Sequence, residues 1–65
     1  MMRTLTRRRR EIAKLAMRGL RDREIAQRLG IHEGTVTVLL HKVYQQLRVR
    51  SRVELILKHQ RKAER

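Results

Sequence analysis

The chain lacks cysteine and proline, and its 65 residues include one tyrosine but neither tryptophan nor phenylalanine. The absence of cysteine excludes disulfide bonds and thiolate metal ligands, so nothing in the sequence indicates an oxidising compartment. With a single aromatic side chain, the chain also lacks the stacking surfaces typical of proteins that bind single-stranded RNA. Because proline is absent and glycine is scarce, helical segments can run uninterrupted, and we expect an all-α fold.

Long apolar runs are also missing. No segment approaches the roughly 18 consecutive apolar residues of a membrane span, and the N-terminus lacks the apolar core of a signal peptide. We therefore expect a cytoplasmic protein with no membrane partner. Sixty-five residues leave room for one small domain, spanning 1–65 with its core at about residues 5–60.

Acidic residues are few: 6 Asp and Glu stand against 18 Lys and Arg, which gives a formal net charge of +12. Such a charge indicates a polyanionic partner but says little about the fold. The three histidines have no cysteine or suitably spaced carboxylates near them to form a metal site, and neither a catalytic triad nor a glycine-rich phosphate loop is present. We expect no enzyme activity, no cofactor and no small-molecule ligand.

The segment 33–47 has helical periodicity with two contrasting faces. At about 100° per residue, one stripe is apolar and is expected to face a core. Its members are Val36, Leu40, Val43 and Leu47. The opposite stripe carries no fixed charge, and its members are Gly34, Thr37, Val38, His41 and Gln45. An uncharged, hydrogen-bonding and methyl-bearing face suits base edges in a DNA major groove, although an ordinary surface helix remains the alternative.

A first helix is expected at about residues 7–18, with Thr6 as its N-cap and Gly19 as its stop. The arginines 7–10 occupy its first turn, where each opposes the helix dipole by about 0.3–1 kcal/mol. Two interpretations stay open for these arginines. They form either an ordinary solvated surface or a patch that faces phosphate groups.

A second helix is expected at residues 22–29, with Asp22 as its cap and Gly30 breaking it in a left-handed turn. Ala26, Gly30 and Val36 stand four and then six residues apart. This spacing lets two helices cross closely through a small side chain and turn sharply. It predicts a helix-turn-helix.

A fourth helix is expected at residues 51–62, because Ser51 and Glu54 form a capping box. Its core face is assigned to Val53, Ile56 and Leu57. Leu55 then points about 160–200° away, alongside His59. We therefore expect Leu55 to be exposed and available for self-association, with a lone exposed leucine of no function as the alternative.

Over Leu5 to Leu55 the sequence resembles the LuxR/FixJ-type helix-turn-helix DNA-binding domains of bacterial transcription regulators. The motifs that carry the resemblance are Leu5-Thr6-x-Arg8, Glu11-Ile12, Gly19-Leu20, Glu24-Ile25-Ala26-x-x-Leu29-Gly30-Ile31, Thr35-Val36, Leu47, Val49 and Ser51-Arg52-Val53-Glu54. The resemblance implies a four-helix domain that binds double-stranded DNA. It further implies that the third helix enters the major groove and the fourth forms a two-fold dimer contact.

The chain departs from the family pattern at several helix ends and on the third helix. Members usually have glutamate, serine and glycine at the positions that here are Arg9, His32 and Arg48. These changes suggest weaker helix ends. The usual Lys-x-His after Thr-Val is here Thr37-x-Leu39, and the basic residue often found one turn later is His41. The usual recognition charge is thus absent, and we expect Leu39 to pack at the edge of the core.

The expected function is sequence-specific DNA binding in transcription regulation, with helix 33–47 in the major groove and helix 51–62 as the dimer contact. Base reading is assigned to Thr37, Val38, His41 and Gln45. Phosphate contacts are assigned to Arg23, Thr35, Lys42, Arg50 and Arg52. The homodimer contact is assigned to Leu55 and His59. The alternative is a stand-alone interaction module that pairs with a related regulator and modulates it.

Overall fold

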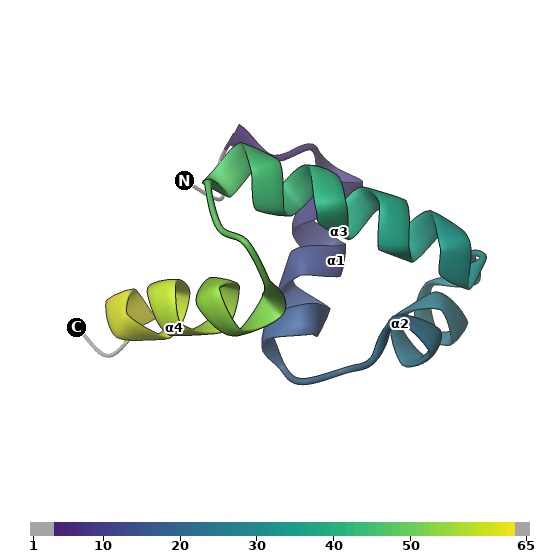
Figure 1. The fold of residues 1–65 in the computed structure, drawn as a ribbon. Helices are drawn as coiled ribbons and strands as arrows, with labels where there is room; N and C mark the ends of the chain where they lie inside the picture. The colour runs from purple at the N-terminus through teal and green to yellow at the C-terminus, as the bar shows by residue number, and fades with distance from the viewer. Residues whose placement is uncertain (1–3, 64–65) are drawn as a thin grey trace.

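A computed structural model describes the backbone of residues 4–63 and the side chains of residues 4–58. This part of the chain contains four helices and no strand, which confirms the all-α prediction. The helices are α1 (Arg7–Met17), α2 (Asp22–Leu29), α3 (Glu33–Leu47) and α4 (Arg52–Ala63). In Figure 1, α3 lies across the top, α1 passes behind it, and α2 and α4 lie below on opposite sides. None of these helices is long and apolar enough to cross a membrane.

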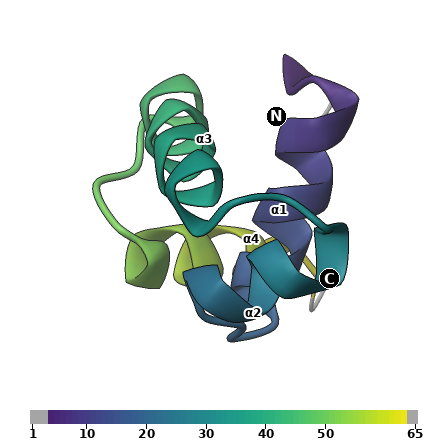
Figure 2. The ribbon, with the colours of Figure 1, turned by 90° about the vertical axis from the view of Figure 1, so that its right-hand side faces the viewer.

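The core lies where α3 packs against α1 and α2, and α4 covers one end of it. Figure 2, seen along α3, shows α1 beside it and α2 below. All four apolar residues predicted for the inner stripe of α3 are buried. The complete set of buried side chains in the described part is Leu5, Ile12, Ala13, Ala16, Ile25, Ala26, Val36, Leu40, Val43, Leu47, Val49 and Leu55. Leu39 packs at the edge of this core, as predicted.

The start of α1 is capped as the sequence predicts. The hydroxyl of Thr6 accepts a hydrogen bond from the main-chain N–H of Arg9 at 3.2 Å. The helix ends at Met17, one residue earlier than predicted, and the chain then turns through Gly19 with a φ of +93°. Both ends therefore follow local signals in the sequence.

Three of the four arginines at the start of α1 have partners within the molecule. The guanidinium of Arg9 donates to Gln46 Oε1 on α3 at 3.1 Å. Arg10 donates to the carbonyl of Leu5, and Arg8 lies 3.6 Å from the carboxylate of Glu11. The contacts of Arg9 and Arg10 hold α1 to α3 and to the preceding segment, whereas the pair of Arg8 and Glu11 lies within α1. Arg9 and Arg10 therefore take part in the packing of α1.

The start of α2 differs from the prediction by one residue. Arg21, not Asp22, occupies the N-cap position, and its main-chain N–H donates to Glu24 Oε1 at 2.8 Å. The carboxylate of Asp22 is thus available for other partners. The end is as predicted: Gly30 adopts a φ of +70°, and the N–H of the next residue, Ile31, donates to the carbonyl of Ala26 at 3.0 Å.

The orientation of α4 overturns the prediction for its faces. Leu55 is 0% exposed, whereas Val53 and Leu57 are 64% and 60% exposed, and Ile56 is half-buried. The sequence correctly places Leu55 on the opposite side of the helix from Val53 and Leu57. The prediction of which side faces the core was wrong, because Leu55 faces it. The prediction placed the side with three apolar residues against the core, whereas the fold buries the side that carries Leu55.

Two cationic side chains beside Leu55 help to explain why the face of α4 with a single leucine is the buried one. Arg52 and Lys58 stand three residues before and after Leu55, so both flank it on the helix surface. Arg52 donates to the carbonyl of Leu20 at 2.5 Å, and Lys58 donates to the carbonyl of Leu47 at 3.3 Å. Their aliphatic stems can cover apolar surface while the charged heads satisfy main-chain oxygens. A lysine or arginine on α4 therefore does not indicate that its side of the helix faces solvent.

The capping box before α4 forms with one variation. Ser51 Oγ accepts from the main-chain N–H of Glu54 at 3.4 Å, which is a long contact. The carboxylate of Glu54 reaches back to the N–H of Arg50 at 2.9 Å. The helix begins at Arg52, close to the predicted start.

The C-cap of α3 is strained. Arg48 has a φ of +59° in the left-handed region, where family members usually have glycine. This conformation costs a residue with a side chain about 1–2 kcal/mol. We expect Arg48→Gly to raise the free energy of unfolding by about 0.5–1 kcal/mol, after allowance for the greater freedom of glycine in the unfolded chain. Urea denaturation measures this change.

Arg18→Gly is the matched control, because Arg18 is also an arginine C-cap but has a φ of −81°. It removes the same charge from a residue without left-handed strain, so it should give no gain in stability. Equal stabilisation by both variants would assign the effect to charge reduction.

Candidate nucleic-acid interface

The helix-turn-helix formed by α2 and α3 leaves one side of α3 open to solvent. The five uncharged residues opposite the core stripe are all exposed, as predicted, and we call them the reading face: Gly34, Thr37, Val38, His41 and Gln45. Val38 is 54% exposed, so its methyl groups are accessible from outside the molecule. The four residues assigned to base reading therefore lie together on one surface of one helix.

Two members of the reading face have neighbours that restrict them. The hydroxyl of Thr37 donates to Asp22 Oδ2 on α2 at 2.8 Å and lies 3.2 Å from the carbonyl of Glu33. The imidazole of His41 lies against the ring of Tyr44, with centroids 6.3 Å apart and ring planes tilted by 46°. The first of these contacts ties the reading face to the other helix of the motif.

The cationic and hydroxyl groups assigned to phosphate contacts are mostly on the surface. Four of the five are exposed: Arg23 on α2, Thr35 and Lys42 on α3, and Arg50 before α4. The exposed cations come from three segments: α2, α3 and the residues before α4. That arrangement suits contacts to the phosphate backbone.

Arg52 has a different environment from the other four. Its guanidinium donates to Asp22 Oδ1 at 2.6 Å and to the carbonyl of Leu20, and its side chain is 27% exposed. The group is therefore engaged within the molecule, and α4 is held to α2 through it. This is a structural role, and the sequence analysis missed it because Asp22 and Arg52 stand 30 residues apart.

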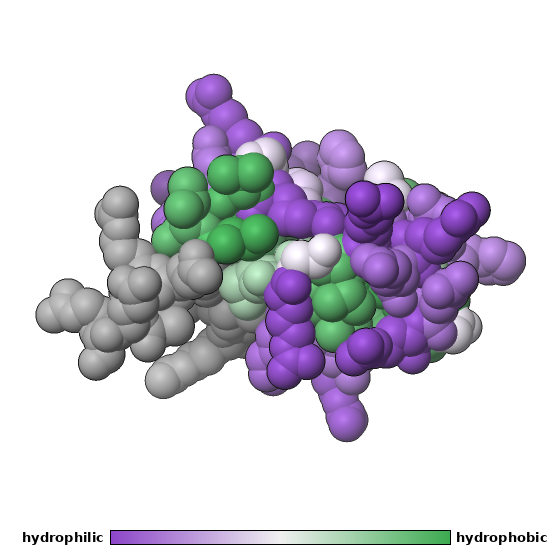
Figure 3. Space-filling view, turned by 90° about the horizontal axis from the view of Figure 1, so that it is seen from below, coloured by the Kyte–Doolittle hydropathy of each residue, from purple (hydrophilic) through white to green (hydrophobic). Residues whose placement is uncertain are grey.

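The predicted dimer contact needs correction. Leu55 is fully buried and cannot meet a second molecule, and the side chain of His59 lies outside the described residues. The exposed apolar residues of α4 are instead Val53 and Leu57. Figure 3 shows apolar surface on the side of α4 and a second apolar area right of the centre, while most of the remaining surface in that view is hydrophilic.

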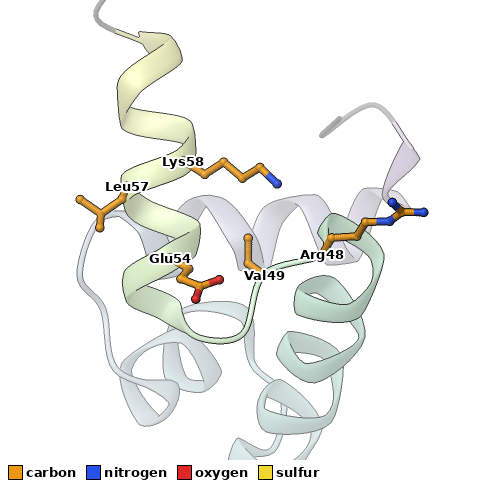
Figure 4. Close-up of a pocket in the computed structure, with 5 residues that line it drawn as sticks. All are labelled: Arg48, Val49, Glu54, Leu57 and Lys58. Atoms are coloured by element: carbon orange, nitrogen blue, oxygen red, sulfur yellow. The ribbon is translucent and has the colours of Figure 1, made fainter.

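A shallow hollow of about 250 Å³ lies beside this apolar surface. Its lining residues are Arg48, Val49, Glu54, Leu57 and Lys58. Glu54 and Lys58 point toward Val49, whereas Leu57 points outward from α4 (Figure 4). Among the side chains that the structure describes, no three histidine, cysteine or acidic groups gather as metal ligands would.

The comparison with known families identifies the chain. A family model described as "Bacterial regulatory proteins, luxR family" matches residues 3–59. No curated protein and no solved structure matches the sequence. The matched region covers all four helices apart from the last residues of α4. The chain therefore belongs to the LuxR family of bacterial regulatory proteins, and it is a DNA-binding helix-turn-helix domain of transcription regulation.

Proposed function

We propose that this domain binds a specific DNA operator by inserting α3 into the major groove, and that it regulates transcription from that site. The observation that carries the proposal is the exposed, uncharged reading face of α3, opposite a buried apolar stripe on the same helix. Hydrogen-bonding and methyl-bearing side chains suit base edges in the major groove, and this face carries both kinds. The alternative function is an interaction module that pairs with a related regulator and modulates it, and the match to a DNA-binding family does not favour it.

Base recognition is assigned to the four reading-face side chains. Val38 and the methyl group of Thr37 suit the C5 methyl group of thymine, whereas the amide of Gln45 suits the edge of adenine. His41 can donate to or accept from a base, depending on its tautomer. The absence of a fixed charge on this face means that specificity depends on shape and neutral contacts.

Affinity is assigned to the phosphate backbone. Arg23, Lys42 and Arg50 supply cations, and Thr35 near the N-terminus of α3 supplies a hydroxyl. With a formal net charge of +12, binding should release many counterions and weaken steeply as salt rises. This part of the interaction carries no direct sequence information.

We further propose that two copies bind an inverted repeat through α4. Val53 and Leu57 stand one turn apart on the same exposed side of this helix, and a two-fold contact would bring each close to its own copy. Because each copy carries the charge of +12, self-association in solution should be weak, and DNA should screen the repulsion. A regulator of this kind works in the cytoplasm, at the nucleoid.

Selection of bound duplexes from a pool with a randomised core tests the proposal. The wild-type chain should enrich an inverted repeat. Val38→Ala and His41→Ala should each cost about 1–3 kcal/mol of discrimination at one or two base positions. Lys42→Ala, a neighbour on the same helix, is the control and should weaken all sequences alike. If both reading-face substitutions leave the sequence preference unchanged, other residues recognise the bases. If the selected site lacks two-fold symmetry, the proposed dimer is contradicted.

A further inference from the structure

One carboxylate connects the reading face to the fourth helix. Asp22, at the start of α2, accepts from the Thr37 hydroxyl through one oxygen at 2.8 Å and from the Arg52 guanidinium through the other at 2.6 Å. Its side chain is 26% exposed, so it lies largely beneath the surface. Three helices, α2, α3 and α4, therefore meet at this group. Within the described part of the chain, no other member of the reading face forms a side-chain hydrogen bond to another helix.

The partners of Thr37 determine what its hydroxyl can offer to DNA. A hydroxyl group has one hydrogen to donate. The two neighbouring oxygens, Asp22 Oδ2 at 2.8 Å and the Glu33 carbonyl at 3.2 Å, are both acceptors. The hydrogen is thus directed into the protein, and it is not available to the major-groove acceptors N7 and O6 of guanine. What Thr37 can present to a base is its methyl group and an oxygen lone pair.

Arg52 lowers the electrostatic cost of a carboxylate at this position. An unpaired negative charge beneath a DNA-binding surface would repel the phosphates. The guanidinium of Arg52 neutralises Asp22, and a charge-assisted bond at 2.6 Å also holds the carboxylate in place. The second carboxylate oxygen then remains oriented toward Thr37.

We propose that Asp22 is a positioning residue for base recognition. By holding the Thr37 hydroxyl inward, it makes Thr37 recognise its base pair through the methyl group, and so selects thymine and disfavours guanine at that position. This inference rests on the proposed insertion of α3 into the major groove. It assigns a specificity role to a residue that does not itself touch a base.

Asp22→Asn is the informative substitution, because it keeps the shape of the side chain while it replaces one acceptor with a donor and removes the charge paired with Arg52. The amide oxygen must face Arg52, which has only hydrogens to donate, so the amide nitrogen faces Thr37. Thr37 then accepts a hydrogen bond, and the Glu33 carbonyl at 3.2 Å is the one acceptor that remains near its own hydrogen, so the hydrogen can turn to a base acceptor more readily than in the wild-type chain. The preference for thymine at one operator position should therefore relax, and guanine should be admitted.

The experiment applies the randomised-duplex selection to the full chain and its variants, after circular dichroism has shown that each is folded. Thr37→Ser removes the methyl group and should lower the preference for thymine at one position by about tenfold. Thr37→Val removes the hydroxyl and keeps a methyl group, so it should keep that preference while losing the contact with Asp22. In the Thr37→Val background, Asp22→Asn should no longer alter the preference at that position.

The outcomes separate three ideas. If Thr37→Ser keeps the preference and Thr37→Val loses it, the hydroxyl recognises the base and the inference is overturned. If Asp22→Asn weakens all sequences equally, or acts the same with and without the Thr37 hydroxyl, Asp22 has only a structural role. If the wild-type chain itself selects no sequence, the proposed function fails, and that result is distinct from either of the other two.

Discussion

Replacing Leu55 with aspartate is expected to unfold the domain. Leu55 is 0% exposed and is the core residue of α4. Truncating a buried leucine to alanine alone costs about 2–5 kcal/mol, and an unpaired carboxylate at the same place adds a desolvation penalty. A folded domain of 65 residues has a total stability of only about 3–10 kcal/mol. Circular dichroism at 222 nm should therefore show the loss of most of the helical signal at room temperature.

Leu57→Asp is the matched control, since it makes the same substitution two residues later on the same helix. Leu57 is 60% exposed, so the variant should stay folded with a melting temperature within a few degrees of wild type. It would place two carboxylates in the proposed dimer contact, and cooperative binding to an inverted repeat should be lost while binding to one half-site persists. If the Leu55→Asp variant stays folded, the result supports the orientation of α4 predicted from sequence. If Leu57→Asp still binds cooperatively, the result contradicts the proposed dimer through α4.

Arg52→Ala should cause the second-largest loss, about 2 kcal/mol of unfolding free energy. The substitution leaves the carboxylate of Asp22 without its cation and the carbonyl of Leu20 without its donor. Both side chains of the Asp22–Arg52 pair are only about a quarter exposed, at 26% and 27%, so water compensates incompletely. Urea denaturation gives the loss directly. Arg52→Lys should recover only part of the lost stability. An ammonium group cannot bond the carbonyl of Leu20 and the carboxylate of Asp22 in the geometry of the planar guanidinium.

Arg23→Ala is the comparison that separates structure from DNA binding. Arg23 is exposed on α2, so its removal should change stability by less than about 0.5 kcal/mol. It should nevertheless weaken binding to all DNA sequences to a similar degree. If Arg52→Ala instead left stability unchanged and weakened every DNA sequence alike, Arg52 would have the phosphate-binding role predicted from sequence.

Local sequence signals determined the helices and the reading face. The bounds of α3 and its buried stripe follow from a period of 3.6 residues. The Thr6 cap and the Gly30 turn follow from the preferences of single residues. These features depend on residues within a few positions of one another, so a single sequence contains enough information to predict them. The burial of one side of α3 also left the opposite side exposed, as predicted.

The tertiary structure alone decided the orientation of α4 and the roles of Asp22 and Arg52. Periodicity shows that Leu55 opposes Val53 and Leu57, but it cannot show which side meets the rest of the molecule. That choice depends on the carbonyls of Leu20 and Leu47, which accept from Arg52 and Lys58 across 32 and 11 residues of sequence. Likewise, Asp22 contacts Thr37 and Arg52 because three helices converge on it. Hydrogen bonds to distant main-chain oxygens leave no periodic pattern, so the sequence predicted the helical faces, and packing of the helices determined which face of α4 is buried.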